Sequence, residues 1–452
     1  MEEVKVTKLV HGGQGLATLA DGRKVFVWNA LPGETVRVRV IKKKRSYAEA
    51  IAEEIVVASP ERVTPREENY LATSPWQMMT FAAENRYKAD IARELFAHEK
   101  VILPGDSSDA TKKSRSLDLR SKDAHSAEAA FSYASEESPS TSVVHTDDEW
   151  RYRNKMEYSF WGDEQGLHLA LHRRGSHGKQ IVQGSELAIP ALDAGANAML
   201  AELRKLDIRA GNLKTIIVRS SQNGDVVAAL YTKVDDFAKI PLPAGLKGLR
   251  VYYSNPKSPA SVPTKLLYEL GDVTLQDELL GQTFTYDVDS FFQVNLLVYE
   301  QALARIKEYV QADPIDMYAG VGSIGLSVGA KTLVELDPAT AAMARLNCSR
   351  SVLEHLEQTE VVEADAANSI QSIVLDRPVI FDPPRAGLHA KVVERCLEVK
   401  PPQIIYLSCN PATQARDLAL LQEAYDIDFF EIYNFFPRTP HIETLAILSR
   451  KP

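Results

Sequence analysis

The stretch "DMYAGVGSIGL", Asp316 to Leu326, follows an apolar strand-like segment and precedes a helix-like one. Its glycines, Gly320, Gly322 and Gly325, permit a tight turn and let a ligand approach the backbone. Glu335 ends the next strand, where a carboxylate can accept hydrogen bonds from ribose hydroxyls. The pattern predicts a site for a nucleoside-bearing cofactor, although a nicotinamide site, or a turn needed only for packing, has the same signature.

Around this turn, from about residue 287 to the C-terminus, apolar strands alternate with helical segments. Such alternation predicts an α/β domain with a doubly wound, largely parallel sheet. The last two apolar segments, "DIDFFEIYNFF" and "ETLAILSR", have no helix between them. We therefore expect them to form an antiparallel hairpin at one edge of the sheet.

Two successive strands of this domain end in residues that can do chemistry. In "VIFDPPRAGL" two prolines hold the loop after Asp382 extended and aim its carboxylate at the ligand edge of the sheet. In "IIYLSCNPATQARDLALL" the strand ends at Cys409, and a helix follows. The helix dipole would stabilise a thiolate, the form that a nucleophilic cysteine needs. Taken singly, each feature is also compatible with structural loop chemistry or with packing.

Glu443 precedes the last apolar strand, beside His441. It could act as a general base if it faced the thiol of Cys409, and a solvated carboxylate is the alternative. The other two cysteines, Cys348 and Cys396, fall within helices and are interpreted as packing residues.

The composition is that of an ordinary globular protein, with 45% apolar and 25% charged residues. Three cysteines and ten scattered histidines predict neither disulfides nor a metal site. The chain has no membrane-length apolar run, and its start, "MEEVKV", is unlike a signal peptide, so we expect a cytoplasmic protein. A net charge of −9 argues against indiscriminate coating of nucleic acid but leaves local RNA-binding patches open.

Residues 1–60 contain short alternating strands separated by Asp-Gly and Pro-Gly turns, which predicts a small β-barrel. Consecutive basic residues there, including Lys42, Lys43 and Arg45, could bind phosphates or form a solvated strand edge.

Residues 104–149 are rich in serine and charge and poor in large apolar side chains, so we predict a disordered insert. The segment "WRYRNKMEYSFW" follows and places Arg151, Arg153 and Lys155 between aromatic residues. Such a strand could contact RNA, and a half-buried strand with a polar face is equally compatible.

Together these segments resemble one family, the S-adenosylmethionine-dependent RNA uracil-5-methyltransferases, which make 5-methyluridine in ribosomal or transfer RNA. The resemblance rests, in chain order, on "DSFFQVN", "DMYAGVGSIGL", "VELDP", "FDPPRAGL", "YLSCNPATQARDL" and "TPHIETLAIL". The N-terminal module is similar to the family's TRAM domain, an OB-like RNA-binding barrel. The implied architecture is a TRAM-like barrel at 1–60, a central α+β RNA-binding domain at 61–285 that contains the insert, and a Rossmann-like methyltransferase domain at 286–452.

The resemblance also implies roles for individual residues. Cys409 would attack carbon 6 of the target uracil, Glu443 would remove the proton from carbon 5 after methylation, and Asp382 would hydrogen-bond the uracil edge. The cofactor, S-adenosylmethionine, would be held by Gln293, Tyr318, Gly320, Gly322, Glu335, Asp365 and Asp382. The target base would have to leave its stack to reach the thiol.

The chain departs from the family in one respect. Many members bind an iron–sulfur cluster through a cysteine-rich segment after the TRAM domain, but here that segment reads "ENYLATSPWQMM" and the usual fourth-ligand region reads "VQGSELAIP". We therefore expect no iron–sulfur cluster, with Trp76, Met78 and Met79 filling the space.

Three other functions are compatible with part of the sequence. A catalytically inactive RNA-binding protein would be expected to lack the nucleophile or the base. A nicotinamide oxidoreductase would leave "DPPRAGL" and "SCNPAT" unused, and a cytosine-5-methyltransferase has different cysteine loops. By analogy with TRAM-containing members we expect the substrate to be 23S ribosomal RNA, with transfer RNA as the alternative. We also expect the protein to be a monomer.

Overall fold

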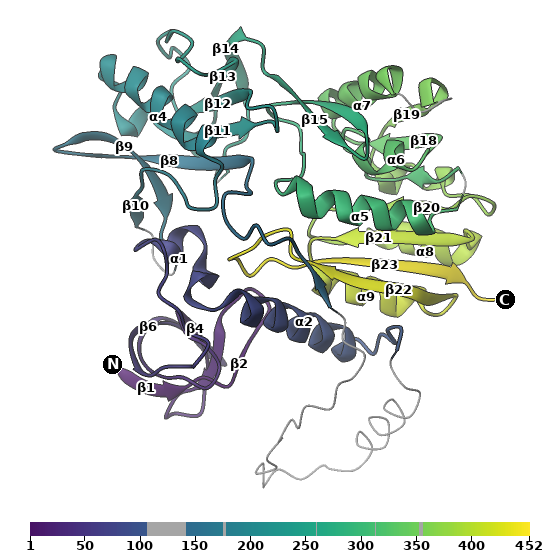
Figure 1. The fold of residues 1–452 in the computed structure, drawn as a ribbon, viewed down its shortest axis with the longest axis horizontal. Helices are drawn as coiled ribbons and strands as arrows, with labels where there is room; N and C mark the ends of the chain where they lie inside the picture. Colours follow the sequence, from purple (N-terminus) through teal and green to yellow (C-terminus); the bar gives the residue numbers. More distant parts are fainter. Residues whose placement is uncertain (106–141, 175–177, 259, 312, 352–355) are drawn as a thin grey trace.

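The computed structural model describes residues 1–105, 142–174, 178–258, 260–311, 313–351 and 356–452. These residues form an N-terminal barrel, a central sheet with a covering helix, and a C-terminal sheet between helices (Figure 1). Most of the serine-rich insert predicted at 104–149, namely 106–141, lies outside the described residues.

The N-terminal six-stranded sheet curls into a barrel, as the alternation of apolar and polar residues predicts (Figure 1). Its strand order is β1-β5-β6-β4-β3-β2. In β5, Val36 and Val38 point into the barrel, while Arg37 and Arg39, which alternate with them along the strand, face outward. The strands are β1 (Glu2–Lys5), β2 (Lys8–Leu9), β3 (Gly15–Thr18), β4 (Lys24–Trp28), β5 (Thr35–Lys43) and β6 (Tyr47–Val57).

The central sheet has seven strands in the order β10-β9-β8-β11-β12-β13-β14, all antiparallel except the pair β12–β13. Helix α4 packs on it because Leu192, Ala196, Met199 and Leu203 recur at helical spacing and are fully buried. The elements are β8 (Lys155–Asp163), β9 (Gly166–His172), β10 (Lys179–Ile181), α4 (Pro190–Lys205), η2 (Ala210–Asn212), β11 (Leu213–Ser220), β12 (Val226–Thr232), β13 (Gly248–Tyr253) and β14 (Lys265–Gly271).

The C-terminal sheet has eight strands in the order β19-β18-β17-β20-β21-β23-β22-β7. Strands β17 to β21 are parallel, and β22 and β23 form the expected antiparallel hairpin. Contrary to the expectation, the hairpin does not form the edge of the sheet, because β7 (Val143–Val144) pairs with β22 beyond it. The elements are α5 (Leu296–Tyr309), β17 (Ile315–Asp316), α6 (Ser323–Ser327), β18 (Thr332–Glu335), α7 (Pro338–Arg350), η3 (Leu356–Gln358), β19 (Glu360–Glu363), η4 (Ala366–Asn368), η5 (Ile370–Ser372), β20 (Val379–Phe381), α8 (Ala390–Val399), β21 (Gln403–Ser408), α9 (Pro411–Leu421), β22 (Tyr425–Tyr433) and β23 (Glu443–Arg450).

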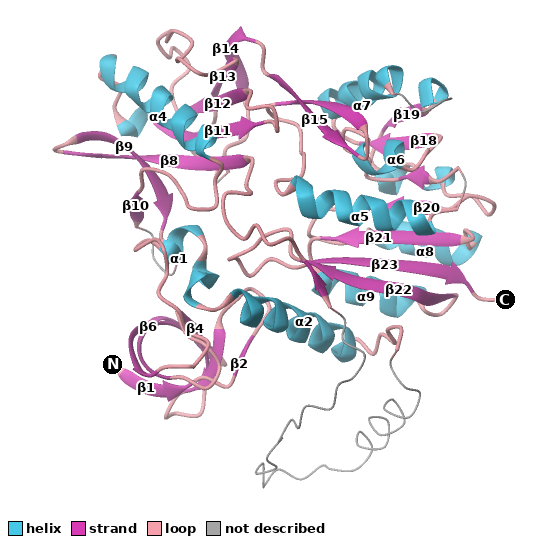
Figure 2. Ribbon diagram, in the orientation of Figure 1, coloured by secondary structure: helices cyan, strands magenta, loops and turns pink. Residues whose placement is uncertain are grey.

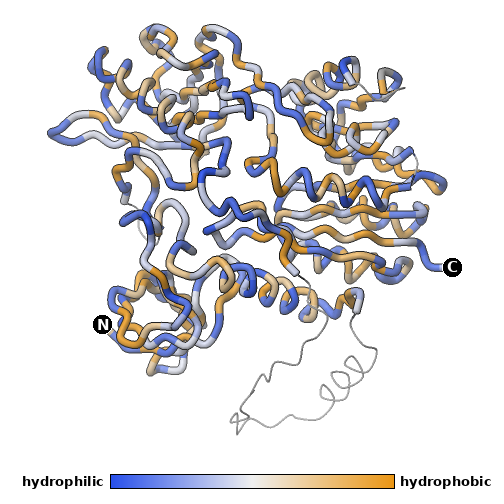
Figure 3. Tube along the Cα trace, in the orientation of Figure 1, coloured by the Kyte–Doolittle hydropathy of each residue, from blue (hydrophilic) through white to orange (hydrophobic). Residues whose placement is uncertain are grey.

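Helices cover both faces of this sheet, so its central strands are buried on both sides (Figure 2). Along β21, Ile405 and Leu407 belong to the core under α5 and α7, and Ile404 and Tyr406 belong to the core under α8 and α9. The hydropathy trace accordingly shows apolar residues along β21 and β23 (Figure 3). Continuous apolar strands are expected where a parallel sheet is covered twice.

Two segments that the sequence places outside the C-terminal domain pack against it. Helix α2 (Phe81–His98), which follows α1 (Tyr70–Thr73) and η1 (Pro75–Met78), buries Phe96 in the core under α8 and α9. The hairpin of β15 (Thr274–Leu279) and β16 (Gln282–Asp287) packs under α7. Both segments carry apolar faces that their own domain does not cover.

The end of the predicted insert differs from the expectation. Within 142–149, β7 (Val143–Val144) pairs in parallel with β22 and forms the last strand of the sheet. Glu149 forms an ion pair with the buried Arg438. Hydrogen-bond and charge partners from distant parts of the chain therefore order a segment whose own composition predicts disorder.

Candidate active site

The two residues predicted as nucleophile and base lie at the open end of adjacent strands. In the antiparallel pair β21–β23, the last registered residues are Ser408 and Thr444. Cys409 follows Ser408, and Glu443 precedes Thr444, so the ladder places these two side chains opposite each other. Strand β20 pairs with the other side of β21 and ends at Phe381, so Asp382 follows at the same edge.

The loops that carry these groups are tied together by hydrogen bonds. The Asn410 side chain accepts from the backbone N–H of Ala412 (3.2 Å), which caps α9, and donates to the carbonyl of Arg385 (2.8 Å). The Thr413 hydroxyl also donates to that carbonyl (3.3 Å). The residues after Cys409 therefore fix the Asp-Pro-Pro-Arg loop against the thiol.

The electrostatics of the crevice differ from the expected stabilised thiolate. Burial, followed by the charges of Glu443 and Asp382, raises the pKa of Cys409 to about 12, against the opposing effect of Arg385. Burial and Asp316 raise the pKa of Asp382 to about 7. Burial and Asp382 raise the pKa of Glu443 well above its usual range. Desolvation and like charge thus keep Cys409 a neutral thiol in the free protein, in place of the expected thiolate.

The glycine turn after β17 has one open position and two packed ones. A Cβ atom at Gly325 would lie 2.5 Å from Leu333, and one at Gly322 would lie 2.9 Å from Leu326, so packing requires both glycines. At Gly320, which has a φ of +57°, a Cβ would meet no atom within 4 Å. The backbone at Gly320 therefore borders open space where a ligand could approach.

Carboxylates surround this open position. Glu335 accepts hydrogen bonds from the N–H groups of Gly320 (2.9 Å) and Asp337 (2.8 Å). Asp316 accepts from the Gly325 N–H (2.9 Å), and its other oxygen, Oδ1, is buried and has no hydrogen-bond partner among the described residues. An unpartnered buried oxygen beside an open backbone is what a site for a ligand with hydrogen-bond donors requires.

The other predicted cofactor residues lie on neighbouring loops. Asp365 caps η4 by accepting from Ala367 N–H (2.7 Å), and its charge, after burial, helps to raise the pKa of Tyr318 to about 12. Gln293 is buried in the loop before α5, and its carbonyl accepts from Asn154 of the central domain (3.0 Å). The structure brings Tyr318 and Asp365 together, and it gives no hydrogen bond from the Gln293 carboxamide to the described residues.

Sequence reasoning missed Tyr299, which links the glycine turn to the crevice. This buried tyrosine of α5 shares a hydrogen bond with the Ser323 hydroxyl (2.7 Å), directly after Gly322. Burial raises its pKa well above 10, and the charges of Asp382 and Asp316 act in the same direction. In the sequence Tyr299 is one apolar residue of an amphipathic helix, so no local signal marks it.

Sequence reasoning also missed a buried ion pair beneath the Glu443 loop. Lys88 of α2 is fully buried and bonds Glu84 (2.9 Å), the Asn434 side chain (2.5 Å) and the Phe436 carbonyl (3.0 Å). Glu84 in turn accepts from the Arg438 backbone N–H (2.9 Å). A Glu–Lys pair four residues apart usually indicates an exposed helix face, so the sequence signal is misleading here.

Trp76 joins the barrel to the same loop. Its indole N–H donates to the Gly13 carbonyl of the barrel (3.2 Å), and its backbone N–H donates to the Arg438 carbonyl (3.1 Å). Met78 and Met79 are buried in the same cluster, together with Ile442 next to Glu443. Trp76 and the two methionines therefore pack beside the Glu443 loop, and none of them lines the cavity between the two segments that would carry cluster ligands, where they were expected.

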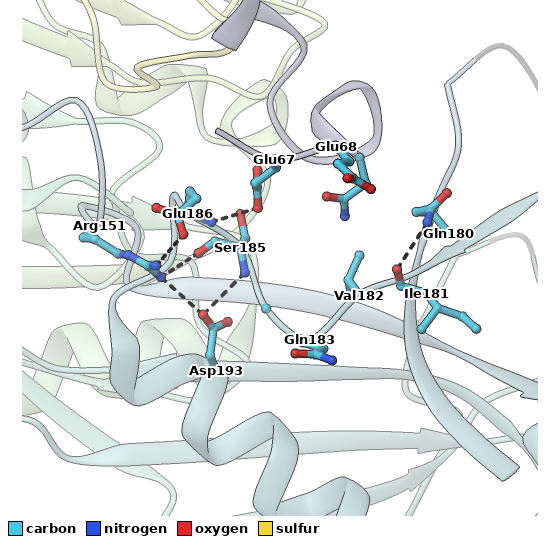
Figure 4. A pocket seen from close by; sticks show the side chains of 12 residues that line it. Glu67, Glu68, Arg151, Gln180, Ile181, Val182, Gln183, Ser185, Glu186 and Asp193 are labelled. Carbon is cyan, nitrogen blue, oxygen red and sulfur yellow. Dashed lines mark hydrogen bonds and ion pairs between the residues drawn. The ribbon is translucent and has the colours of Figure 1, made fainter. Parts of the chain in front are cut away.

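The two segments that would carry cluster ligands in iron–sulfur relatives meet at a cavity of about 420 Å³ (Figure 4). Glu67 accepts a hydrogen bond from the Glu186 backbone N–H (2.9 Å) and thereby joins them. Arg151, which lines the cavity, forms ion pairs with Glu186 (2.7 Å) and Asp193 (3.4 Å). These oxygen donors do not suit an iron–sulfur cluster, which needs thiolates, and the described residues contain no metal-binding group of three or more His, Cys, Asp or Glu.

The predicted RNA-contact residues have different environments. Lys42, Lys43 and Arg45 are exposed at the end of β5 and in the turn that follows it, with Lys42 3.4 Å from Glu49. Arg151 lies in the wall of the cavity, where it also donates a hydrogen bond to the Ser185 carbonyl (2.9 Å). Lys155 is half-buried, and burial, then the charge of Arg219, lowers its pKa to about 8.

The fold and these sites define an α/β methyltransferase-type domain preceded by a small barrel. Residues 118–451 match the family described as tRNA (Uracil-5-)-methyltransferase, and residues 1–52 match the TRAM domain. The chain therefore belongs to the tRNA (Uracil-5-)-methyltransferase family, and it is an S-adenosylmethionine-dependent RNA methyltransferase with an N-terminal TRAM domain.

Relatives and a solved structure span the whole chain. An uncharacterized RNA methyltransferase of Lactobacillus johnsonii is 28% identical over 474 residues, covering 99% of this chain and 98% of that protein. One of Thermotoga maritima is 26% identical, covering 100% and 99%. The crystal structure of Pyrococcus abyssi tRNA (uracil-54, C5)-methyltransferase with S-adenosyl-L-homocysteine has a similar fold, with a TM-score of 0.71 at 21% identity over 99% of this chain and 100% of that one. None of the helices in the described residues is long and apolar enough to cross a membrane.

Proposed function

We propose that this protein methylates carbon 5 of a uridine in 23S ribosomal RNA through a covalent bond between Cys409 and carbon 6 of the base. The observation that carries the proposal is the placement of Cys409, Asp382 and Glu443 at the same edge of three adjacent strands, β21, β20 and β23. Uracil carbon 5 is a poor nucleophile, and addition of a thiolate at carbon 6 turns it into the nucleophilic carbon of an enolate.

The protons can be followed through the crevice. As the Sγ–C6 bond forms, the thiol proton leaves Cys409, and Asp382, whose pKa is about 7, is the acceptor at hand. The protonated Asp382 then donates a hydrogen bond to the uracil oxygen that becomes the enolate. Glu443 removes the proton from carbon 5 after methylation, carbon 5 and carbon 6 regain their double bond, and Cys409 is released as a thiolate. The raised pKa of Glu443 suits this step, because a carboxylate of higher pKa is a stronger base.

The residues around the glycine turn suit the cofactor. When bound, S-adenosylmethionine supplies an electrophilic methyl group. Glu335 would accept hydrogen bonds from the ribose hydroxyls while it still accepts one from the Gly320 N–H. The exposed Leu336 beside it offers an apolar surface for the adenine. Asp365, Tyr318 and Gln293 would complete the site, and Tyr299 would hold Ser323 and the turn in place.

The RNA target has two candidates. The complete TRAM barrel in front of the catalytic domain favours ribosomal RNA by analogy, and we expect a cytoplasmic monomer. Transfer RNA is the second candidate, because the matched family is described by that substrate and the P. abyssi protein with a similar fold is a tRNA methyltransferase. The barrel and the central sheet would bind the RNA on either side of the crevice.

Nucleoside mass spectrometry of ribosomal and transfer RNA fractions tests the proposal. Cells lacking the protein are compared with cells that carry the wild type or Cys409→Ala. Loss of 5-methyluridine from 23S RNA, restored by the wild type and not by the alanine variant, is the expected result. Loss from the transfer RNA fraction would favour the second candidate. A purified wild-type protein that leaves unmodified forms of both RNAs without 5-methyluridine would overturn the proposal.

A further inference from the structure

Within the part of the chain that the structure describes, three arginines near the crevice have no carboxylate partner, although the full chain contains 61 acidic and 52 basic residues. Arg153 and Arg174 come from the central domain, and Arg385 follows the Asp-Pro-Pro sequence. Many other arginines of the described chain, such as Arg250 with three carboxylates, are paired. The Nε atoms of Arg153 and Arg174 are in addition buried without a hydrogen-bond partner. Unpaired guanidinium groups in an acidic protein indicate a site for an anion from outside the chain.

These arginines converge on His441, two residues before Glu443. Arg385 Nη2 lies 3.5 Å from His441 Nδ1. Burial, then the charges of Arg385, Lys88, Arg153 and Arg174, lowers the pKa of His441 to about 3. Lys88 is buried and paired with Glu84, so the positive charge around this neutral histidine that lacks a carboxylate partner among the described residues comes from the three arginines.

Aromatic rings alternate with the arginines. The Arg153 guanidinium lies 5.8 Å from the centroid of the Phe436 ring, and Phe436 in turn contacts His441 edge to face at 5.3 Å. The Arg174 guanidinium lies 5.1 Å from the centroid of the Trp28 ring, on strand β4 of the barrel. Rings and guanidinium groups side by side are the elements with which proteins bind single-stranded nucleic acid.

The barrel is held against this region by its β2–β3 turn. A Cβ atom at Gly13, whose φ is +94°, would lie 2.4 Å from the Cβ of Pro440, so only glycine allows the turn to approach this closely. His11, in the same turn, is near enough to Arg385 for that charge, after burial, to lower its pKa. Residues of all three folded regions therefore meet around His441.

We propose that Arg153, Arg174 and Arg385, with the rings of Trp28 and Phe436, form a clamp for the phosphates of a single-stranded segment of the RNA beside Cys409. The inference rests on the proposed function for the identity of the RNA and deepens it by naming what holds the strand. A guanidinium donates to phosphate through two parallel N–H groups, so each arginine fixes the position of the strand as well as attracting it. Arg151, an earlier candidate, is excluded from the clamp because Glu186 and Asp193 engage it.

The clamp is tested by the salt dependence of binding to a fluorescent single-stranded RNA oligonucleotide that contains the target uridine, measured by anisotropy with the full-length protein. Arg174→Ala and Arg153→Ala are each expected to weaken binding about tenfold and to reduce the slope of log K against log salt by about 0.7. Trp28→Leu is expected to weaken binding with the slope unchanged. Arg173→Ala is the matched control, because Arg173 neighbours Arg174 in the chain but bonds Gln180 (3.1 Å).

The outcomes separate the clamp from the proposed function, because binding is measured without methyl transfer and a methylation assay is run in parallel on the same RNA. Unchanged slopes in both arginine variants, with thermal unfolding like that of the wild type, would overturn the clamp even if methylation proceeds. Reduced slopes in these variants alone, with no methylation by the wild type, would support the clamp and contradict the proposed reaction. An equal loss of slope in Arg173→Ala would show general electrostatics and would also overturn the clamp.

Discussion

Cys409 and Glu443 lie opposite each other at the open end of the β21–β23 ladder, one position beyond the pair Ser408 and Thr444. The arrangement brings together two groups that act at opposite ends of the proposed reaction, in which the thiol would begin the sequence of steps and the carboxylate would complete it. Each group is also hard to ionise, because burial raises both pKa values, the charge of Glu443 adds to the effect at Cys409, and the charge of Asp382 adds to it at both. We therefore expect that a covalent intermediate can be trapped and that the methylation rate depends on pH.

The variant Glu443→Gln should accumulate a covalent protein–RNA adduct. In the proposed reaction the Cys409–C6 bond forms before Glu443 is needed, and an amide cannot take the carbon 5 proton that must leave before elimination. Denaturing gel electrophoresis with labelled RNA and S-adenosylmethionine should show a slowly migrating band, with turnover reduced by roughly 100-fold or more.

Three further variants control this experiment. Cys409→Ala should give neither adduct nor product, and the double variant should resemble Cys409→Ala. Glu398→Gln, which changes a surface glutamate paired with Arg395 (3.0 Å), should behave like the wild type. A Glu443→Gln protein that turns over normally without an adduct would remove Glu443 from the role of base.

The single-turnover methylation rate should rise with pH between about 6 and 9. The reactive forms of Cys409 and Glu443 are the ionised ones, and their pKa values are raised, so increasing pH increases the reactive fraction. The slope should approach about tenfold per pH unit where a single thiol proton limits the rate. Since the charge of Asp382 raises both pKa values, Asp382→Asn should shift the profile to lower pH while it lowers the maximal rate. A bell-shaped profile with a maximum below pH 7 would contradict this order of ionisation.

Lys88→Met should destabilise the fold by about 3 to 5 kcal/mol, because it leaves the buried Glu84 carboxylate without its cation. Urea unfolding measures the change, and the double variant Lys88→Met/Glu84→Gln should recover part of the loss. Lys205→Met, which breaks an exposed pair with Glu202 (2.8 Å), should change stability by no more than about 0.5 kcal/mol. Equal effects of the two lysine variants would mean that the buried network contributes no more than a surface pair.

The sequence predicted those features that depend on neighbouring residues. The β–α alternation, the C-terminal hairpin, and the loops that carry Asp382 and Cys409 follow from local patterns of apolar residues, glycine and proline. Residues whose role comes from distant partners were missed. Lys88 meets Asn434, which lies 346 positions away in the chain, and Tyr299 meets Asp382 and Ser323 only after the sheet has formed. The predicted low pKa of Cys409 was wrong for the same reason, because the helix dipole is local and the burial and opposing carboxylates are not.

Asp316→Asn should stabilise the protein at pH 8 and have little effect at pH 4. Burial, and in part the charge of Glu335, raises the folded-state pKa of Asp316 to about 7, against about 4 in an unfolded chain. Between these values the unfolded chain has released the proton that the folded protein retains, so the free energy of unfolding falls as pH rises through this window and then levels off. The total loss is up to about 4 kcal/mol, and the neutral asparagine avoids it while its oxygen can still accept from the Gly325 N–H. Urea unfolding at both pH values measures the difference, with the exposed Asp426→Asn as control.

If the unpartnered Oδ1 of Asp316 is retained for the cofactor, the stabilised variant should also bind S-adenosylhomocysteine more weakly by calorimetry; unchanged affinity would assign Asp316 to the turn alone.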